Sequence, residues 1–511
     1  MNKRKVFLLL ALQLCVGFVF ALDRPFVIMD VVHTYNLDPH KANSSADAQV
    51  LTGLYEGLFV YDPYSLEPTF GLIEDYKVSR DKLRWTFYLQ ENLTFSNEEP
   101  ITAETVKNSW IELLNPKESH PFASLFDCVQ GAAEYRQGKA TAEDVGIVVQ
   151  GDYKISLILN APAEHLPSIL CHHAFSVVHQ DKNVFSGPYC IESQEGNTVI
   201  LKKNPFYYDK DNVALEEIHF IQSDDPEENA YLFNTGRADW VISNASIPSI
   251  IDKQSIYLTA EFATEYLFFK VYEEPWNRAD FRNALLTATP WEELRSQAFI
   301  PASTLIIGIG NYVPPAGLFD YDIDEARYML AEAKKNAGMA EDAPLEITIA
   351  VSDYEYAINQ ALLLVDAWSQ LGITVNVSKT PMDRYLDSVE GWDADIFSYI
   401  WLGDFADPLS FLELFRSDST LNVTGWKNET FDDLLQQASS TSGTERFELL
   451  SKAEDVLLSD GLIFPVSHPV TLNVVDPAVS GWSSNALDIH PLKYLDIKPT
   501  QQYIPNLVMA P

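Results

Sequence analysis

Residues 345–377 read LEITIAVSDYEYAINQALLLVDAWSQLGITVNV, and this stretch decides the fold class. Apolar and polar residues alternate from Leu345 to Val351 and again from Ile373 to Val377, which is typical of β-strands. The segment between them, Ala357 to Leu371, has the length and apolar spacing of a helix, and Gly372 ends it. Two strands joined by one such helix pair in parallel with a right-handed crossover, so the sequence predicts an α/β fold.

Strand and helix patterns elsewhere predict that this α/β fold has several lobes. Phe26 to Val32 is an apolar run expected to form a buried strand, and apolar residues at helical spacing lie between Asp47 and Leu58. Thr102 is suited to cap a helix that Asn115-Pro116 ends. Further short strands are expected at 85–89, 199–201 and 218–221. Such separate strands beside a βαβ unit indicate more than one packed unit.

Length, hydrophobicity and charge set the class of protein. The chain has 511 residues, of which 47% are hydrophobic, enough for large cores in two to four domains. Lys and Arg total 35 and Asp and Glu total 73, so the formal net charge is −38. A field of this sign repels nucleic acid and anionic membrane surfaces, so both are disfavoured as partners.

The N-terminal segment has the pattern of a cleaved export signal. Lys3-Arg4-Lys5 is a positive region, and an apolar stretch from Val6 to Phe20 follows it. Val19-Phe20-Ala21 places small residues where a signal peptidase needs them. We therefore expect residues 1–21 to be removed and the mature protein to be periplasmic. Lipidation at Cys15 is disfavoured, because bulky Leu14 precedes it and apolar residues continue after it.

Three cysteines follow the expected cleavage site, and they do not indicate a disulfide-rich protein. Cys128, Cys171 and Cys190 allow at most one disulfide. The run Cys171-His172-His173 has metal-ligating side chains, but neighbours in sequence rarely converge on one ion, so a packing role is favoured. No phosphate loop, HExxH, GxSxG elbow or strand–GxGxxG–helix unit is present. We therefore expect no metal and no cofactor.

Residues 396–408 read IFSYIWLGDFADP, and they hold the strongest local signal for a binding site. An apolar strand leads into Trp401 and then into Asp404, which aromatic residues flank. A carboxylate in such surroundings needs donors or a cation, and a ligand ammonium group can supply the charge. Two other interpretations stay open: a helix cap or structural ion pair, and a hydrolytic carboxylate pair formed by Asp404 and Asp407.

The residues resemble a known family, the family 5 solute-binding proteins of ABC importers, which includes the oligopeptide- and dipeptide-binding proteins. Motifs similar to those of the family occur in the same order along nearly the whole chain. They are LDPH at 37–40 with LYEGLF at 54–59, LRWTFYL at 83–89, ITAETV at 101–106, SGPY at 186–189 with NPFYY at 204–208, PW at 275–276 with FRNAL at 281–285, and WLGDFADP at 401–408.

The resemblance implies a periplasmic-binding-protein fold, in which two jaw lobes close on a ligand and a third domain extends one of them. Domain I would comprise residues 22–55, 179–262 and 471–511, domain II residues 56–178, and domain III residues 263–470. The chain would cross between the jaws near Phe262 and near Val470, and these two crossings would form the hinge.

The resemblance also implies a set of ligand-binding residues. Asp404 stands where the family's peptide binders pair with the peptide α-ammonium, Trp401 is the neighbouring aromatic residue, and Ile400 to Leu402 form the strand that pairs with the peptide backbone. Tyr266 and Phe122 fall at aromatic wall positions, where Phe122 replaces a tyrosine, and Asn43 is expected in the facing strand.

Two departures from the family concern the same strand. A disulfide that some members have at the positions of Ala263 and Leu402 is absent, and Ser398 stands where some members place a cation for the ligand carboxylate.

The favoured function is therefore that of an exported, non-enzymatic subunit that captures peptides and delivers them to an ABC-type permease, as a monomer. One alternative is the same fold binding an oligosaccharide, stacked on Trp401 and Tyr266, or a metal chelate. The other is a secreted hydrolase that uses Asp404 and Asp407.

Overall fold

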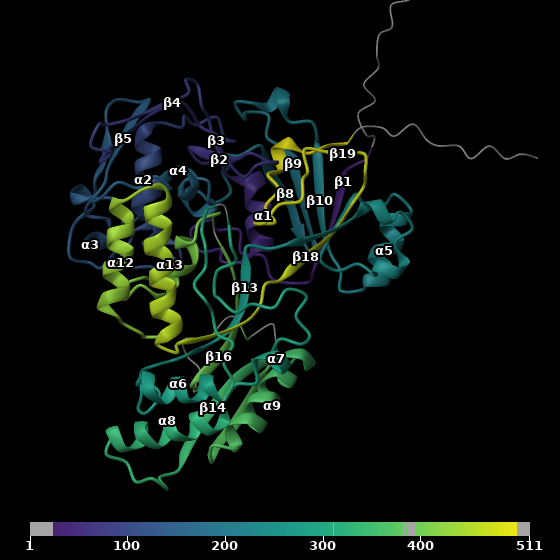
Figure 1. The fold of residues 1–511 in the computed structure, drawn as a ribbon. Coiled ribbons are helices and arrows are strands. Elements are labelled where there is room, and N and C mark those ends of the chain that lie inside the picture. The colour runs from purple at the N-terminus through teal and green to yellow at the C-terminus, as the bar shows by residue number, and fades with distance from the viewer. Residues whose placement is uncertain (1–23, 310, 382–384, 386–393, 404, 498–511) are drawn as a thin grey trace, which may run out of the picture.

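The described residues form three large sheets and two short strand pairs. The structure is a computed structural model, and it describes residues 24–309, 311–381, 385, 394–403 and 405–497. The expected signal peptide and Asp404 lie outside these ranges. The sheet with seven strands, the sheet with four strands and the sheet with five strands lie in separate parts of the molecule (Figure 1).

The five-stranded sheet contains the stretch that decided the fold class. Its order is β15-β14-β16-β13-β17. β14 (Leu345–Ser352) and β15 (Ile373–Thr380) are parallel, and α9 (Glu355–Ser369) joins them, as predicted. One face of α9 is buried through residues such as Leu364 and Trp368, and Gly372 follows the helix with φ of 74°. The alternation in the sequence therefore corresponds to residues that are buried on this sheet.

The other elements of this part complete its layers. The remaining strands are β13 (Ala263–Phe269), β16 (Ile396–Leu402) and β17 (Ile463–Ser467). The helices are α6 (Ala279–Thr287), α7 (Trp291–Leu294), α8 (Ile323–Asn336), α11 (Leu409–Leu412), α12 (Glu429–Ser440) and α13 (Gly443–Ser459). α12 and α13 pack on each other and lie beside the part that holds the four-stranded sheet (Figure 1).

The seven-stranded sheet has the order β12-β18-β11-β1-β10-β9-β8 and draws on three distant stretches of the chain. Its strands are β1 (Phe26–Asp30), β8 (Tyr189–Glu195), β9 (Thr198–Lys203), β10 (Glu217–Gln222), β11 (Trp240–Ile242), β12 (Ile256–Ala260) and β18 (Val470–Val475). β1 is central and is buried on both faces, with Phe26 and Ile28 in one core and Val27 and Met29 in another. α1 (Ser45–Leu54) and α5 (Pro226–Asn234) belong to this part.

The four-stranded sheet is antiparallel and has the order β4-β5-β7-β6. Its strands are β4 (Ile73–Val78), β5 (Arg84–Leu89), β6 (Ile147–Val149) and β7 (Lys154–Ile158). Thr102 caps α2 (Ala103–Leu113) with a complete capping box, as predicted. Shorter elements are β2 (Phe59–Tyr61), β3 (Pro68–Phe70), α3 (Ala132–Arg136), α4 (Leu166–Ile169), β19 (Val479–Ser480) and β20 (Asp496–Ile497).

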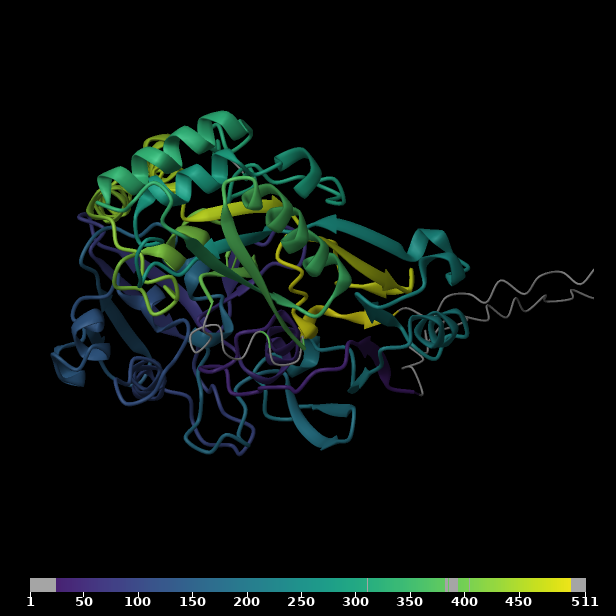
Figure 2. The same ribbon diagram turned by 90° about the horizontal axis from the view of Figure 1, so that it is seen from below.

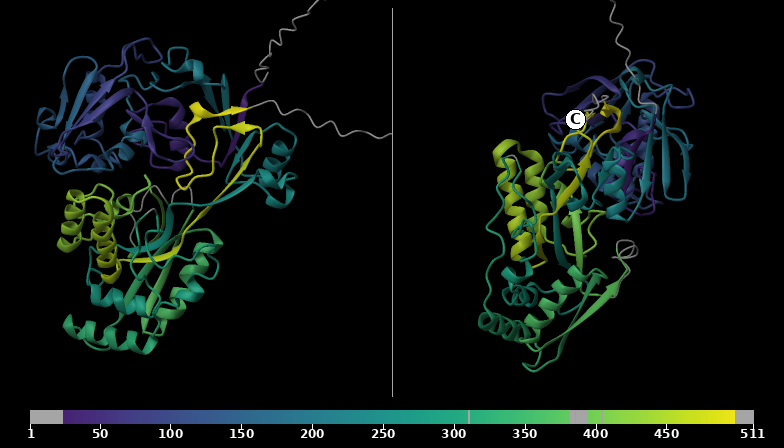
Figure 3. Two further views of the ribbon diagram at one scale, coloured as in Figure 1. Left: turned by 45° about the horizontal axis from the view of Figure 1, so that its top comes forward. Right: turned by 90° about the vertical axis from the view of Figure 1, so that its right-hand side faces the viewer.

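Two short connections link the seven-stranded and five-stranded sheets. β12 ends at Ala260 and β13 begins at Ala263, while β17 ends at Ser467 and β18 begins at Val470. The connections contact each other through a hydrogen bond from Glu261 N–H to the Pro469 carbonyl oxygen at 3.0 Å. Seen from below, the yellow strands β17 and β18 run one after the other through the molecule (Figure 2), and both connections lie between its upper and lower parts (Figure 3).

Two expectations about the N-terminal region are wrong. The helix expected up to Leu58 ends at Leu54, because Tyr55 is extended and the chain turns so that the Glu56 carboxylate reaches Tyr207 and Tyr208. Asn43, which was expected in a strand, lies in the loop between β1 and α1.

No helix among the described residues is long and apolar enough to cross a membrane. The residue boundaries of domains I, II and III stay predictions.

Candidate ligand-binding cleft

The strand β16 has an open edge at the end that faces the seven-stranded sheet. It pairs with β13 over its whole length, from Ile396 opposite Phe269 to Leu402 opposite Ala263. On its other side, β14 pairs with it only at Ile396 and Phe397. No strand of the described chain therefore covers that side of residues 398–402.

Hydrogen bonds show which backbone groups of β16 point to the open edge. The Tyr385 hydroxyl donates to the Ser398 carbonyl oxygen at 2.7 Å and accepts from the Ser398 N–H at 2.9 Å, on the side away from β13. Backbone groups alternate in direction along an antiparallel pair. Ile400 and Leu402 therefore present their N–H and C=O groups to the same open edge as Ser398, whereas Gly403 N–H points back to the Phe262 carbonyl oxygen at 2.8 Å.

The predicted site residues on this sheet are brought together, but their side chains differ in exposure. Ile400 is 54% exposed, and Leu402 is partly buried opposite Ala263. Trp401 is partly buried, and its indole N–H donates to the Ser410 carbonyl oxygen at 3.0 Å. Tyr266 is buried in the core, where its ring contacts the edges of Tyr399 and Phe415. The outer backbone edge of β16 is thus accessible, and the buried Tyr266 ring packs against Tyr399 of this strand on the core side.

Phe122 and Asn43 belong to another region. The Phe122 ring is buried and lies 4.3 Å from His172 and 5.7 Å from His173 between centroids. His173 Nε2 lies 3.3 Å from the carbonyl oxygen of Ala42, the neighbour of exposed Asn43. The structure therefore joins these two positions through His173, not through the strand β16.

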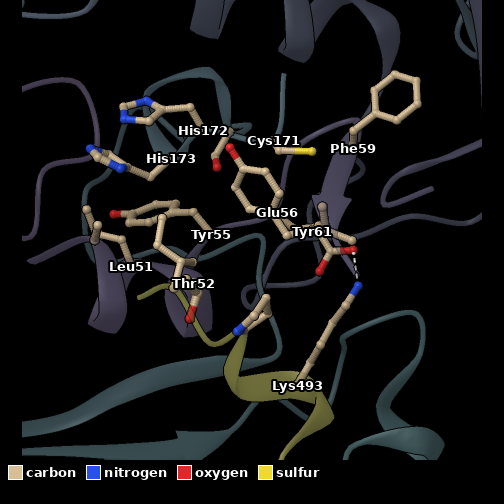
Figure 4. Close-up of a pocket in the computed structure, with 16 residues that line it drawn as sticks. Leu51, Thr52, Tyr55, Glu56, Phe59, Tyr61, Cys171, His172, His173 and Lys493 are labelled. Atoms are coloured by element: carbon tan, nitrogen blue, oxygen red, sulfur yellow. Dashed lines mark hydrogen bonds and ion pairs between the residues drawn. The ribbon is translucent and has the colours of Figure 1, made fainter. Parts of the chain in front are cut away.

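A small cavity of about 50 Å³ lies between α1, β2 and residues 489–493 (Figure 4). Its lining includes Tyr55, Glu56, Tyr61 and Lys493, together with Cys171, His172 and His173. Tyr61 also packs into the core of the five-stranded sheet. This cavity therefore lies where the segment after α1 meets the five-stranded part.

Glu56 is the main polar group of this cavity, and the sequence had marked it only as part of a motif. Its buried carboxylate forms an ion pair with Lys493 at 3.1 Å (Figure 4). It also accepts hydrogen bonds from the Tyr207 and Tyr208 hydroxyls at 2.5 and 2.7 Å. Burial lowers the pKa of Lys493, but Glu56 and the neighbouring Tyr494 and Asp209 together raise it by more, so Lys493 is charged. The bonds of Glu56 therefore hold together three segments that are far apart in sequence.

The Cys171-His172-His173 run is a packing feature of the same region. Burial lowers the pKa of both histidines, that of His173 to about 4, so both are neutral at pH 7. The thiols of Cys128, Cys171 and Cys190 form no disulfide. Within the described chain, no three His, Cys, Asp or Glu side chains are placed to hold a metal ion.

A second cavity, of about 160 Å³, lies between the four-stranded part and helices α11 and α12. Asp127, which lines it, accepts from Arg136 of α3 at 2.5 and 2.8 Å and from Arg416 of the five-stranded part at 2.7 Å. The Asp127–Arg416 ion pair links the two parts across the cavity.

The Asp407 carboxylate also forms an ion pair with an arginine. Its carboxylate receives two bonds from Arg446, at 2.6 and 2.8 Å. Burial raises the pKa of Asp407, but the Arg446 guanidinium lowers it below the usual range, so the group is a charged structural partner. A carboxylate held in this way is poorly suited to exchange protons in a hydrolytic pair with Asp404, which lies outside the described residues.

Comparisons with known proteins agree with this architecture. The model of bacterial extracellular solute-binding proteins, family 5 Middle, matches residues 67–422. The chain is 24% identical over 490 residues to the dipeptide-binding protein DppE of Bacillus subtilis, covering 91% of this chain and 89% of the relative. It is 26% identical over 485 residues to the oligopeptide-binding protein OppA of the same organism, covering 88% of each.

A solved structure confirms the predicted fold. The Haemophilus influenzae OppA complex with the peptide RPPGFSPFR superposes with a TM-score of 0.81 at 21% identity, covering 93% of this chain and 99% of that one. The expected α/β periplasmic-binding-protein fold is therefore correct.

Proposed function

Because this chain belongs to family 5 of the bacterial extracellular solute-binding proteins, we propose that it is the exported subunit of an ABC importer that captures peptides. Relatives that match over most of its length are named for dipeptide and oligopeptide binding. In this proposal the mature chain is a periplasmic monomer without catalytic activity. Ligand binding closes the cleft, and the closed form delivers the peptide to a membrane permease.

The observation that carries the proposal is the open edge of β16. Ile400 and Leu402 present backbone donors and acceptors with the spacing of a β-strand, and an extended peptide has the matching groups. Main-chain hydrogen bonds give affinity that does not depend on the peptide sequence. An oligosaccharide has no such regular ladder, so this geometry favours peptides over the sugar alternative.

The site residues take distinct roles in this proposal. Ile400 and Leu402 pair with the peptide backbone, Trp401 forms the neighbouring wall, and Tyr266 keeps the strand in place from the core. Asp404 pairs with the peptide α-ammonium. Phe122 and Asn43 are assigned to the opposite margin of the cleft.

Thermal unfolding with candidate ligands tests the proposal. A ligand that binds only the native state at a hundredfold excess over Kd adds about 2.7 kcal/mol to the free energy of unfolding. A mixture of short peptides should raise the Tm, whereas cellobiose, maltose and free amino acids should not. A shift with either sugar and none with any peptide mixture would contradict the peptide assignment.

A further inference from the structure

Glu265 holds a carboxylate that is buried on the five-stranded sheet without a cation beside it. The residue is 7% exposed, and its Oε2 accepts hydrogen bonds from the Ser467 hydroxyl at 2.6 Å and the Tyr356 hydroxyl at 3.1 Å. Within the described part of the chain, no Lys, Arg or His forms an ion pair with it. Burial raises the pKa of Glu265, which is the penalty for a buried carboxylate without a counter-charge.

A second polar group beside Glu265 is also incompletely paired. Gln360 of α9 is 4% exposed and lies near enough to the carboxylate to lower its pKa. The Gln360 Nε2 atom is nevertheless buried without a hydrogen-bond partner in the described structure. Buried charges in native proteins are usually paired, so the Glu265 carboxylate indicates a place where a cationic group of a ligand can complete the pairing.

The position of Glu265 in β13 places the side chains of Glu265 and Gln360 at the candidate cleft. Glu265 is the third residue of β13, directly after one connection to the seven-stranded sheet, and Ser467 is the last residue of β17, directly before the other. Its cross-strand partner is Ile400, whose side chain is more than half exposed. Directly opposed residues share a face of the sheet, so Glu265 and Ile400 project to the same side.

A peptide strand added at the open edge would bring side chains to that same side. Every second residue of such a strand projects onto the face that carries Ile400 and Glu265. The peptide backbone would lie two strand spacings from β13, about 9–10 Å. A long side chain on the peptide can cross Ile400 over this distance and reach the Glu265 carboxylate.

We propose that Glu265 selects peptides with a long basic side chain, such as lysine, on the residue that lies beside Ile400. The inference rests on the proposed function, because it requires a peptide strand along β16. The basic group supplies the missing counter-charge, and the apolar part of its side chain covers the exposed Ile400 surface.

Calorimetry with two peptide scans tests this proposal. Lysine is moved through each position of tetra-alanine, and norleucine is moved through the same positions as an uncharged control of similar length. At one position the wild-type protein should bind the lysine peptide about tenfold more tightly or better, as expected for a hydrogen bond to a charged group. Glu265→Gln should bind the two peptides equally at that position.

A matched control separates this effect from the loss of any buried glutamate. Glu454 of α13 is fully buried, accepts hydrogen bonds from the Tyr312 hydroxyl and from Ile306 N–H at 2.9 Å, and does not belong to β16 or β13. Glu454→Gln should keep the wild-type preference for lysine. If Glu265→Gln does not fold, the wild-type protein still provides a test: its preference for lysine should fall as the pH is lowered and Glu265 becomes protonated.

The possible results distinguish this inference from the function on which it rests. If the wild-type protein binds none of the peptides, peptide capture itself is wrong. If it binds them but lysine and norleucine are equal at every position, or if Glu265→Gln keeps the preference, the role of Glu265 is wrong while peptide capture stands.

Discussion

The ion pairs of Asp127 predict a large loss of stability when this one carboxylate is removed. Asp127 and Arg136 are almost fully buried, with side chains 7% and 8% exposed, and Arg416 of the five-stranded part binds the same carboxylate. In Asp127→Ala, Arg416 keeps Glu413 and Asp418 as partners. Among the described residues, Arg136 then keeps a hydrogen bond only to the Asp418 carbonyl oxygen, at 2.9 Å, and loses the carboxylate with which it forms its ion pair.

Removing one partner of a buried ion pair costs about 3–5 kcal/mol, and we expect Asp127→Ala to lower the free energy of unfolding by this amount. Urea unfolding followed by circular dichroism measures it. The double variant Asp127→Ala/Arg136→Ala should show a coupling of about 1–3 kcal/mol. Asp280→Ala is the control, because Asp280 and Arg278 are both 35% exposed and the change should cost about 1 kcal/mol or less. Equal losses in Asp127→Ala and Asp280→Ala, with no coupling to Arg136, would refute this reasoning.

Three further changes have defined outcomes. Both ring nitrogens of His40 are buried without a partner in the described structure, and burial lowers the pKa of His40 to about 3. The unfolded state therefore binds a proton below about pH 6.5 that the native state does not, so the free energy of unfolding falls as the pH is lowered. In urea unfolding, His40→Phe should show a fall that is weaker by about 1.4 kcal/mol per pH unit, and no loss of stability at pH 7. A Cβ at Gly403 would lie 2.5 Å from the Phe262 ring, so Gly403→Ala should lose about 1–3 kcal/mol in the same assay, whereas Gly308→Ala, with no atom nearer than 3.7 Å, should lose less. Asp404→Asn should weaken binding of a peptide with a free N-terminus about thirtyfold or more in calorimetry but change little for the N-acetylated peptide, and an equal loss for both peptides would remove Asp404 from ammonium binding.

Local sequence patterns predicted much of the fold because they record local physics. The alternation in 345–377 and the cap at Thr102 depend on residues close in sequence, and both appear in the structure. The family resemblance added the correspondence of Ala263 and Leu402, which are indeed cross-strand partners. Patterns of this kind were sufficient to identify β16 as a candidate binding strand.

The errors and omissions arose where distant segments decide the outcome. Helical spacing continued to Leu58, but the contacts of Glu56 with Tyr207, Tyr208 and Lys493 end the helix earlier. Glu265 was missed because its surroundings come from β17 and α9, more than 90 residues away. Among 73 acidic residues, no sequence signal marks the one that is buried beside an open strand edge.

Hydrogen exchange of individual backbone amides along β16, measured by NMR with and without a bound peptide, tests the central claim most directly. Ile400 and Leu402 present their N–H groups to the open edge, whereas Tyr399 and Trp401 already point to β13. If a peptide adds as a strand, exchange at Ile400 and Leu402 should slow strongly while exchange at Tyr399 and Trp401 changes much less. Tight peptide binding that leaves exchange at Ile400 and Leu402 unchanged would contradict strand addition at β16.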